Sequence, residues 1–374
     1  MSQPEPARAD QPRLPEVDGV ITAAEVEATV EAIAAHQLPD GNIPWVPGGH
    51  TDPWNLVEAA MALDVGGRHR EAERAYQWLR STQRPDGGWF AYYVGNDVKD
   101  PTRDTNVACY VANGVLHHYL STGDDGFLAE LWPVVESAID FALAHQNETG
   151  EIAWRADDPA DGALLTGSSS IHASLRCAIV LAEHLGQERP DWELSLGSLA
   201  HAIQHRPHVF LDKERWAMDW YYPILGGALR GIAAYERVTR GWPTFVVPGR
   251  GVRCVSDRPW ITAAETCELV LTLDAVGCRD QALTLFEWVQ FLRHEDGGYW
   301  TGSNFEDEAF HESGERYPEE QPTWNSAAVV LAAHALGGSG LTSGFFRGEG
   351  LPIGLDRDEV LAAEFALLRD PGDD

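Results

Sequence analysis

Carboxylates stand at several positions where the pattern predicts that a helix begins, and carboxylates used in pairs can move protons as general acid and general base. Asp52 comes directly before Pro53, and Asp104 begins another such run. Glu265 follows three residues after Thr262. An Asp before Pro is also a common helix N-cap, and Thr with Glu at this spacing is also a capping box. Capping and proton transfer therefore both remain open for these side chains.

The surroundings of the three carboxylates favour different roles. A helix N-terminus stabilises an ionised carboxylate through the helix dipole, which suits Asp52 as a general base. Glu265 lies in a polar, aromatic segment after Trp260, where a Glu packed against Trp is suited to hold and donate a proton. We therefore expect Asp52 and Glu265 to be the catalytic pair. Asp104 is a third candidate, which could instead be a cap or an ion-pair partner of Arg103.

Other polar residues are expected to bind substrate or to pair internally. Asp219 and Asp257 are candidates for holding substrate hydroxyl groups, and Glu58, inside an apolar helix, is expected to pair with Arg176 or Arg230. No metalloprotease, nucleophile-elbow, dinucleotide or P-loop motif occurs, and no His or Cys spacing is typical of zinc, so we expect neither cofactor nor metal. Three histidines are expected to be core or loop residues: His117, His118 and His172.

Tryptophan is abundant, with 14 residues in the chain. Flat rings with a polar edge suit the faces of sugars and also suit the cations of isoprenoid chemistry, although any one of them could simply fill the core. We assign Trp54, Trp89, Trp260 and Trp324 to substrate binding, together with Asp104. The wider set expected to line a cleft is Trp45, Trp54, Trp89, Trp154, Trp220, Trp260, Trp300 and Trp324.

An internal repeat positions these residues. Loops rich in Trp, Gly and acidic residues precede runs of small apolar residues at intervals of about 40–65 residues, the scale of helix-pair repeats. The six starts are 51–55, 103–106, 166–170, 219–223, 259–262 and 322–325.

Two kinds of helix alternate in this repeat. Helices before the Asp-Gly turns carry charge on one face, as over 70–80, whereas those after the turns are almost wholly apolar, as over 107–114. We predict an all-α (α/α)6 toroid, in which outer helices surround inner ones whose first residues share one mouth. Helices are expected over 21–37, 71–82, 127–146, 170–185, 280–293 and 323–336, and a hairpin over 244–254.

Length and charge limit the organisation and the partners. We expect residues 1–17 to be a disordered tail and 18–370 to be a single catalytic domain, since 374 residues can form one large domain. The net charge of −31 opposes binding to nucleic acid and to anionic membranes. Five cysteines without a CxxC pair, together with the lack of an apolar leader or membrane span, indicate a cytoplasmic protein with reduced thiols. The sequence does not determine the oligomeric state.

The chain resembles glucoamylase-like (α/α)6 glycoside hydrolases. The resemblance is carried by residues 122–146, with the pattern TGDxxFLxxLWPxVxxA ending at Gln146, and covers about residues 50–335. It implies acid–base hydrolysis of an α-linked glycan, commonly inverting and without a cofactor. The runs 48–55 and 251–260 are similar to a set of actinobacterial proteins that includes endo-acting α-1,4-mannosidases of 3-O-methylmannose polysaccharide.

A second resemblance is to squalene-cyclase and prenyltransferase repeats. It rests on the turn QRPDGGW over 83–89, which is similar to the Gln-Trp motif of those toroids. The Asp-x-Asp-Asp acid of the cyclases and the zinc ligands of the transferases are not found, and shared helix-pair geometry explains the turn. The alternatives to a hydrolase acting on an oligo- or polysaccharide are therefore an isoprenoid cyclase or transferase, with Asp104 as proton donor, and a glycan-binding toroid without catalysis.

Overall fold

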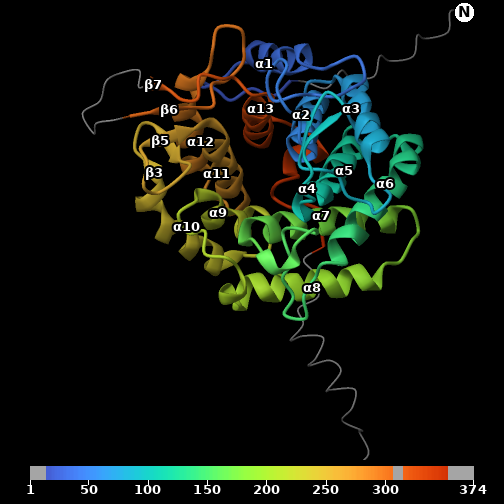
Figure 1. Ribbon diagram of the computed structural model, residues 1–374. Coiled ribbons are helices and arrows are strands. Elements are labelled where there is room, and N and C mark those ends of the chain that lie inside the picture. The colour runs from blue at the N-terminus through green and yellow to red at the C-terminus, as the bar shows by residue number, and fades with distance from the viewer. Residues whose placement is uncertain (1–13, 306–314, 353–374) are drawn as a thin grey trace, which may run out of the picture.

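The inner helices form a closed ring in a computed structural model of the protein, which describes residues 14–305 and 315–352 (Figure 1). Each inner helix contacts the next along the chain, and the last contacts the first, so that the ring closes between α13 and α2. The inner helices are α2 (Pro53–Val65), α4 with α5 (Thr105–Cys109 and Val111–Thr122), α7 (Leu165–His184), α9 (Ala217–Leu225), α11 (Ala263–Ala275) and α13 (Thr323–Gly337).

Outer helices cover the ring, each packed on the inner helix that precedes or follows it in the chain. Helix α3 buries only one face, whereas nearly every side chain of α13 is buried, as expected for outer and inner positions. The predicted (α/α)6 toroid is therefore confirmed. The outer helices are α1 (Ala23–Ala35), α3 (His69–Thr82), α6 (Asp125–Leu143), α8 (Pro190–His205), α10 (Gly231–Phe245) and α12 (Arg279–Val289).

Short strands and 3-10 turns lie in the loops. The hairpin predicted over 244–254 is present as β3 (Val246–Val247) and β4 (Gly251–Arg253), which pair antiparallel. It is part of an antiparallel sheet in the order β3-β4-β5-β6-β7, with strands too short to show an alternating pattern in the sequence. The other elements are β1 (Tyr92–Val94), β2 (Asp97–Asp100), β5 (Trp260–Thr262), β6 (Gly302–Asn304), β7 (Glu315–Arg316), η1 (Pro159–Asp161), η2 (Pro207–Val209), η3 (Gln290–Leu292) and η4 (Leu341–Gly344).

A repeated side-chain clasp joins consecutive outer helices. The amide nitrogen of Gln83 donates to the carbonyl of Gly87 in its own turn and to the carbonyl of Val134 in the next outer helix, α6. The same pair of bonds is made by Gln37, to Gly41 and Glu71, and by Gln146, to Gly150 and Ser195. The QRPDGGW turn is therefore explained by its role in packing consecutive helix pairs together.

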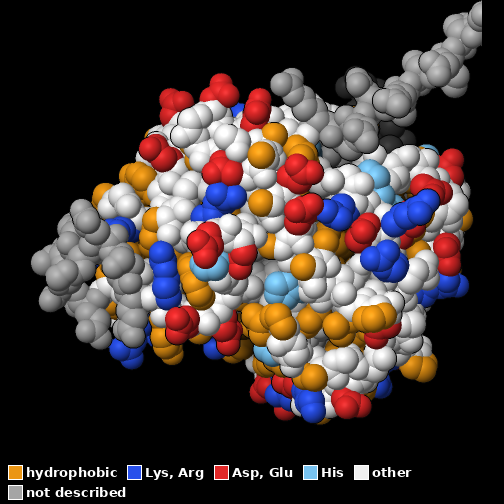
Figure 2. Space-filling model, turned by 90° about the horizontal axis from the view of Figure 1, so that it is seen from above, with side chains coloured by type: hydrophobic (Ala, Val, Ile, Leu, Met, Phe, Trp, Pro, Cys, Tyr) orange, Lys and Arg blue, Asp and Glu red, His pale blue; other side chains and the backbone are white. Residues whose placement is uncertain are grey.

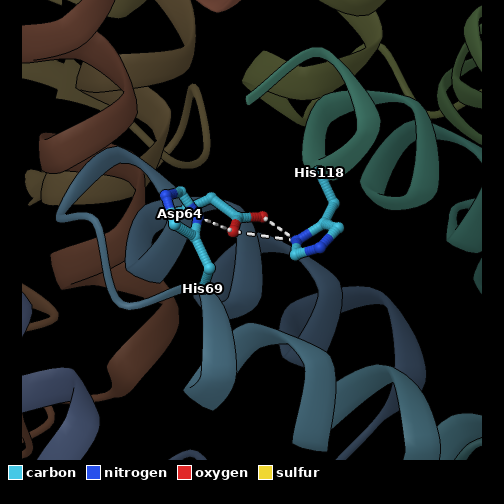
Figure 3. A group of neighbouring side chains, drawn as sticks. All are labelled: Asp64, His69 and His118. Carbon is cyan, nitrogen blue, oxygen red and sulfur yellow. Dashed lines mark hydrogen bonds and ion pairs between the residues drawn. The ribbon is translucent and has the colours of Figure 1, made fainter. Parts of the chain in front are cut away.

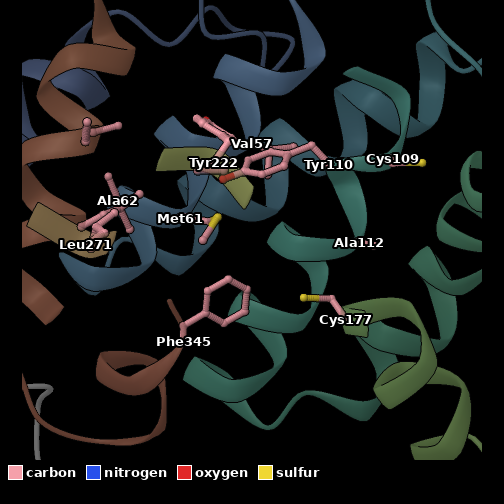
Figure 4. Close-up of a cluster of buried hydrophobic side chains, with 14 of the residues drawn as sticks. Val57, Met61, Ala62, Cys109, Tyr110, Ala112, Cys177, Tyr222, Leu271 and Phe345 are labelled. Atoms are coloured by element: carbon pink, nitrogen blue, oxygen red, sulfur yellow. The ribbon is translucent and has the colours of Figure 1, made fainter. Parts of the chain in front are cut away.

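The end of the ring opposite the helix starts is closed by the segment around η4. Phe345 is buried and its ring lies 5.5 Å from that of His117, near the end of α5. Figure 4 shows Phe345 directed into the centre of the ring, towards Met61 and Cys177. The interior therefore opens mainly at the end where the inner helices begin.

The described residues also bear on the predicted tail and domain bounds, on the cysteines and on membrane spans. Residues 1–13 of the predicted tail and 353–370 of the predicted domain lie outside them, but Val17 is buried and pairs with Ile21, so the packed part begins before residue 18. Thr22 and Glu25 form a capping box at the start of α1. All five cysteines are free thiols, and no described helix has the length and apolarity needed to cross a membrane. Figure 2 shows acidic and basic side chains interspersed over one side of the molecule.

Candidate active site

The starts of the inner helices surround a cleft of about 710 Å³. Sites that bind small molecules are typically concave and combine apolar walls with a few converging polar groups, and this cleft has both. Three of its carboxylates are those that the sequence singled out. The acidic lining residues are Asp52, Glu58, Asp100, Asp104, Glu265 and Glu268.

Asp52 is the N-cap of α2 and is buried at the cleft wall. One carboxylate oxygen accepts the backbone N–H of Asn55 at 2.9 Å, and the other accepts Trp45 Nε1 at 2.6 Å and Asn55 Nδ2 at 2.7 Å. Burial raises the pKa of Asp52 above its ordinary value, and these three donors oppose that rise. Capping and a place in the cleft thus coexist in one residue.

Glu265 lies in the first turn of α11, and its side chain is buried. Thr262 forms no side-chain cap on this helix, so the capping-box interpretation of this pair was wrong. Within the part of the chain that the structure describes, Glu265 Oε2 accepts no hydrogen bond. The side chain also contacts the thiol of Cys254, whose pKa is raised by burial and by the charge of Glu265. The structure therefore gives no capping reason for this glutamate.

Glu268, one turn further along α11, was not singled out from the sequence. It accepts hydrogen bonds from the phenols of Tyr221 and Tyr222. Burial, with a contribution from the charge of Glu265, raises the pKa of Glu268 to about 8. Glu268 therefore keeps its proton near neutral pH. The spacing of three residues from Glu265, within an apolar run, is the signal that could have identified it.

Glu58 completes the group, but not with the expected partner. Tyr110 Oη donates to Glu58 Oε1 at 3.3 Å, and within 14–305 and 315–352 neither Arg176 nor Arg230 forms an ion pair with it. Burial, and next the charge of Glu268, raises the pKa of Glu58 well above its ordinary value. Two carboxyl groups at the bottom of the cleft are thus held in the neutral form.

Asp104 caps α4 through the N–H of Val107 at 3.0 Å and faces the same cleft. Burial raises its pKa to about 6 in spite of these cap bonds, and the charge of Asp52 adds to the rise. The ion pair suggested with Arg103 does not form. Instead Arg103 pairs with two acidic residues outside the cleft, Asp86 and Asp157, each at 2.6 Å.

Aromatic rings form much of the remaining wall. Trp54 stacks on Tyr110 with ring centroids 4.5 Å apart, and Trp45 meets Trp324 edge to face at 5.5 Å. Trp154 lines the cleft as the sequence suggested. The sequence did not single out several other lining residues, among them Trp216, Tyr92 and Met218.

Four of the predicted substrate-binding residues lie outside the cleft lining. Asp219 accepts a hydrogen bond from Thr166 at 2.5 Å, and Asp257 pairs with Arg215 on the exposed surface. Trp89 and Trp260 use their ring N–H groups to donate to backbone carbonyls, those of Leu79 and Tyr317 respectively. These contacts engage the four side chains away from the cleft, three of them with neighbouring segments and Asp257 with a surface arginine. Two other rings of the wider set are also absent from the lining, Trp220 and Trp300.

A group of imidazoles lies at the other end of α2 (Figure 3). Nδ1 of His69 and Nδ1 of His118 each lie 2.9 Å from Asp64 Oδ1, and all three ligand atoms are within 4.8 Å of one another. His118 Nδ1 is also 3.1 Å from Asp64 Oδ2, so this nitrogen points between the two oxygens, as a donor to a carboxylate does. We interpret the group as a hydrogen-bonded tie between α2, α3 and α5.

A known relative decides the family. The MMP endo-(1,4)-3-O-methyl-alpha-D-mannosidase of Mycolicibacterium hassiacum is 50% identical over 352 residues, which cover 93% of this chain and 96% of the relative. The chain belongs to the family of this glycoside hydrolase. No protein-family model matches it.

Solved structures agree with the fold of the hydrolase. A wild-type glycosidase superposes with a TM-score of 0.66 over 84% of this chain and 96% of its own, at 14% identity. A rhamnosidase from Klebsiella oxytoca with rhamnose bound superposes with a TM-score of 0.60 over 87% of this chain and 66% of its own, at 15% identity. At such identities these likenesses establish the toroid and nothing about the substrate.

The structure does not favour the alternative of an isoprenoid cyclase or transferase. A cyclase requires an enclosed apolar cavity, whereas this cleft has six carboxylates in its lining. A glycan-binding toroid without catalysis would use the carboxylates only as helix caps. Glu265 does not fit that interpretation, because it takes no part in a capping box at the start of α11. The chain is a glycoside hydrolase, as its relative is.

Proposed function

We propose that this hydrolase cleaves internal α-1,4 linkages of a 3-O-methylated mannose polysaccharide with inversion, using Asp52 as general base and Glu265 as general acid. The observation that supports the substrate is the 50% identity to the mannosidase over almost the full length of both chains. The observation that supports the residues is their common place in the cleft, on different inner helices.

Asp52 suits the role of base because its carboxylate is oriented by three donors. It would take a proton from a water molecule, whose oxygen then forms a bond to the anomeric carbon while the bond to the leaving-group oxygen breaks. The donors from Trp45 and Asn55 keep the charged form available in a buried place. Asn55 therefore acts as a positioning residue.

Glu265 suits the role of acid because its Oε2 accepts no hydrogen bond from the protein. A proton on this oxygen could be given to the leaving-group oxygen as the glycosidic bond breaks. Glu268, held neutral by its buried site and bonded to two tyrosines, places no like charge beside the carboxylate that forms on Glu265 when it gives up its proton.

The cleft wall suits a methylated sugar. Methyl ethers replace hydroxyl donors with apolar groups, and the lining offers apolar surface in Trp54, Trp216, Trp324, Met218 and Val107. Burial of one methyl group contributes about 0.8 kcal/mol. Contacts with the aromatic rings would thus contribute to the binding free energy of a methylated chain, in addition to contacts with the carboxylates.

The catalytic pair is tested by substitution with two substrates. We expect Asp52→Asn and Glu265→Gln each to lower kcat on the polysaccharide by about 100-fold or more. On an aryl glycoside with a good leaving group, Glu265→Gln should recover most of its activity because the departing group needs no proton, whereas Asp52→Asn should not. Proton NMR of the first product should show the β-anomer.

The control is Asp257→Asn, which alters a surface carboxylate outside the cleft and should leave kcat unchanged. Thermal unfolding separates catalysis from capping, since Asn caps a helix about as well as Asp does. Activity loss that matches a loss of folding, or equal behaviour of the two variants on both substrates, would refute the assignment.

The substrate is tested with paired α-1,4-mannan oligosaccharides that differ only in 3-O-methylation. If two methyl groups are buried against the rings, their removal should lower kcat/KM by about 15-fold, from about 0.8 kcal/mol for each. Fragments of intermediate length should appear first if attack is internal. Equal kcat/KM for both chains, with the catalytic variants still inactive, would retain the hydrolase and reject the methylated substrate.

We also propose that the enzyme works in the cytoplasm. Four of its five free cysteines are buried, and burial raises the pKa of the Cys109 and Cys267 thiols. Thiols packed as small apolar groups need no oxidising compartment.

A further inference from the structure

A second cavity lies at the closed end of the toroid, away from the catalytic cleft. It has a volume of about 290 Å³ and lies where α9 and α11 end and the segment after η4 passes. Its charged lining is entirely basic, although the chain carries 58 acidic and 27 basic residues. The three basic residues are Arg176, Arg230 and Arg347.

Arg176 projects from α7 and is 2% exposed. Its Nε donates to the carbonyl of Pro352 at 2.6 Å, and its Nη2 has no hydrogen-bond partner among residues 14–305 and 315–352. Burial, and next the charge of Arg230, lowers the pKa of Arg176 to about 10, so the guanidinium is still charged at neutral pH. A buried, charged group without a full set of acceptors is costly unless something pairs with it.

Two glycines bring Arg230 beside Arg176. A Cβ at Gly227 would lie 2.2 Å from Arg176 Nη1 and 3.2 Å from Arg230 Nη2. A Cβ at Gly348 would lie 2.8 Å from Arg176 Nη2 and 3.4 Å from Arg230 Nη2. The two guanidinium groups therefore converge on space that any side chain at these positions would fill.

No carboxylate within the described ranges neutralises this pair. The hydrogen bonds of Arg176 and Arg230 go to backbone carbonyls, those of Pro352 and Gly227. Arg347, at the rim, differs because it pairs with Asp274 at 2.7 Å and with Glu349 at 2.6 Å. The positive charge that remains uncompensated thus belongs to Arg176 and Arg230.

We propose that Arg176 and Arg230 form a binding site for a small oxyanion, a phosphate or carboxylate group carried by a metabolite. The unpartnered Nη2 of Arg176 and the outer nitrogen of Arg230 would each donate to an anion oxygen, since guanidinium groups match phosphate and carboxylate geometry. The cavity has room for a substituent on the anion. This site shares no lining residue with the catalytic cleft, although Arg176 also lines a small cavity with Glu58 and Glu268. The proposal does not depend on the substrate proposed above.

The first test uses inorganic phosphate as the probe. We expect titration calorimetry on the full chain to show one site per molecule, with chloride at equal ionic strength giving no heat. Arg230→Gln, which alters an exposed side chain, should weaken the binding at least 10-fold. Arg215→Gln is the matched control, because it removes the same charge at an exposed ion pair with Asp257. Its affinity should equal that of the wild type.

A second variant and a second anion extend the test. Arg176→Lys keeps the buried charge but loses the planar fork, so phosphate should bind more weakly while the unfolding temperature stays close to the wild type. Acetate at equal ionic strength distinguishes a carboxylate source from a phosphate source by the tighter of the two affinities.

Three results would overturn the proposal. The first is the absence of any saturable binding of either anion, and the second is equal weakening by Arg215→Gln and Arg230→Gln. The third is phosphate binding that appears only after Asp356→Asn with Asp358→Asn, because the site would then serve the chain's own acidic residues.

Discussion

At the residue scale, the environment of each carboxylate decides which proton state it holds. Asp52 has three donors around its oxygens, whereas Glu268 has two phenols and a neighbouring glutamate in a buried site. Burial raises the pKa of both and the donors of each oppose that rise, but at Glu268 the charge of Glu265 adds to it. The same chemical group is thus placed in two different environments within one cleft.

A second feature at the residue scale is the group of histidines that contacts Asp64. The pKa of Asp64 is held far below its ordinary value because three imidazoles surround it, and the bond to Asp64 raises the pKa of His69. A raised folded-state pKa stabilises the protein fully below the unfolded value of about 6.5, and this stabilisation is lost as pH rises through the folded value.

We therefore predict a pH-dependent cost for His69→Gln. Its free energy of unfolding should fall below that of the wild type by about 1 kcal/mol at pH 5.5, a value reduced for the partial exposure of His69. The difference should shrink at pH 9, where the imidazole is neutral in both states. Urea unfolding at the two pH values measures this, with His208→Gln at the surface as control. A difference that grows with pH would contradict the ion-pair interpretation.

At the element scale, the Gln clasp and its glycine explain why the turns repeat. Gly87 has a φ of +92°, and a Cβ there would lie 2.1 Å from the carbonyl oxygen of Ser137 in α6. A Cβ at Gly41 or at Gly150 would likewise lie 2.1 or 2.3 Å from a backbone carbonyl oxygen of the next outer helix. These turn positions must therefore be glycine, because a side chain there would prevent consecutive helix pairs from packing.

Substitution at this turn is predicted to be severe. Gly87→Ala should lower the free energy of unfolding by more than about 3 kcal/mol, because the methyl group overlaps the α6 backbone as well as straining φ. Gly123→Ala is the matched control, since Gly123 has a φ of +66° with nothing within 4 Å of a Cβ. Gly123→Ala should lower the free energy of unfolding by only about 1 kcal/mol, because alanine is strained in the left-handed conformation. Denaturant unfolding of both variants checks the contrast, and equal losses would show that packing plays no part.

At the scale of the whole molecule, ring closure brings distant residues together. α13 packs on α2 and α1 packs on α13, so the first and last helix pairs become neighbours. Trp324 and Trp45 meet at the cleft wall for this reason. At the far end, Phe345 lines a small cavity together with Glu58 and Glu268 of the catalytic cleft and Arg176 of the arginine pocket.

Local rules made several features predictable from sequence. The N-caps at Thr22 and Asp52 depend only on neighbouring residues, and the inner and outer helices differ in apolar periodicity, which is also local. Three of the five predicted carboxylates line the cleft because residues at inner-helix starts share the mouth of the ring. Trp89 was misplaced because its position after a turn does not reveal which way the ring points.

The amino-acid sequence by itself determined the helix pairs, their alternation and the mouth at which the inner helices begin, since periodicity, caps and turns are properties of short segments. Only the tertiary structure decided which side chains face the cleft, because that depends on contacts between helices far apart in the chain. Burial raises the pKa of Glu268 although Tyr221 and Tyr222 donate to it, and Asp257 forms an ion pair with Arg215 outside the cleft. Neither partnership can be read from the spacing of the residues, since the partners lie more than 40 positions apart.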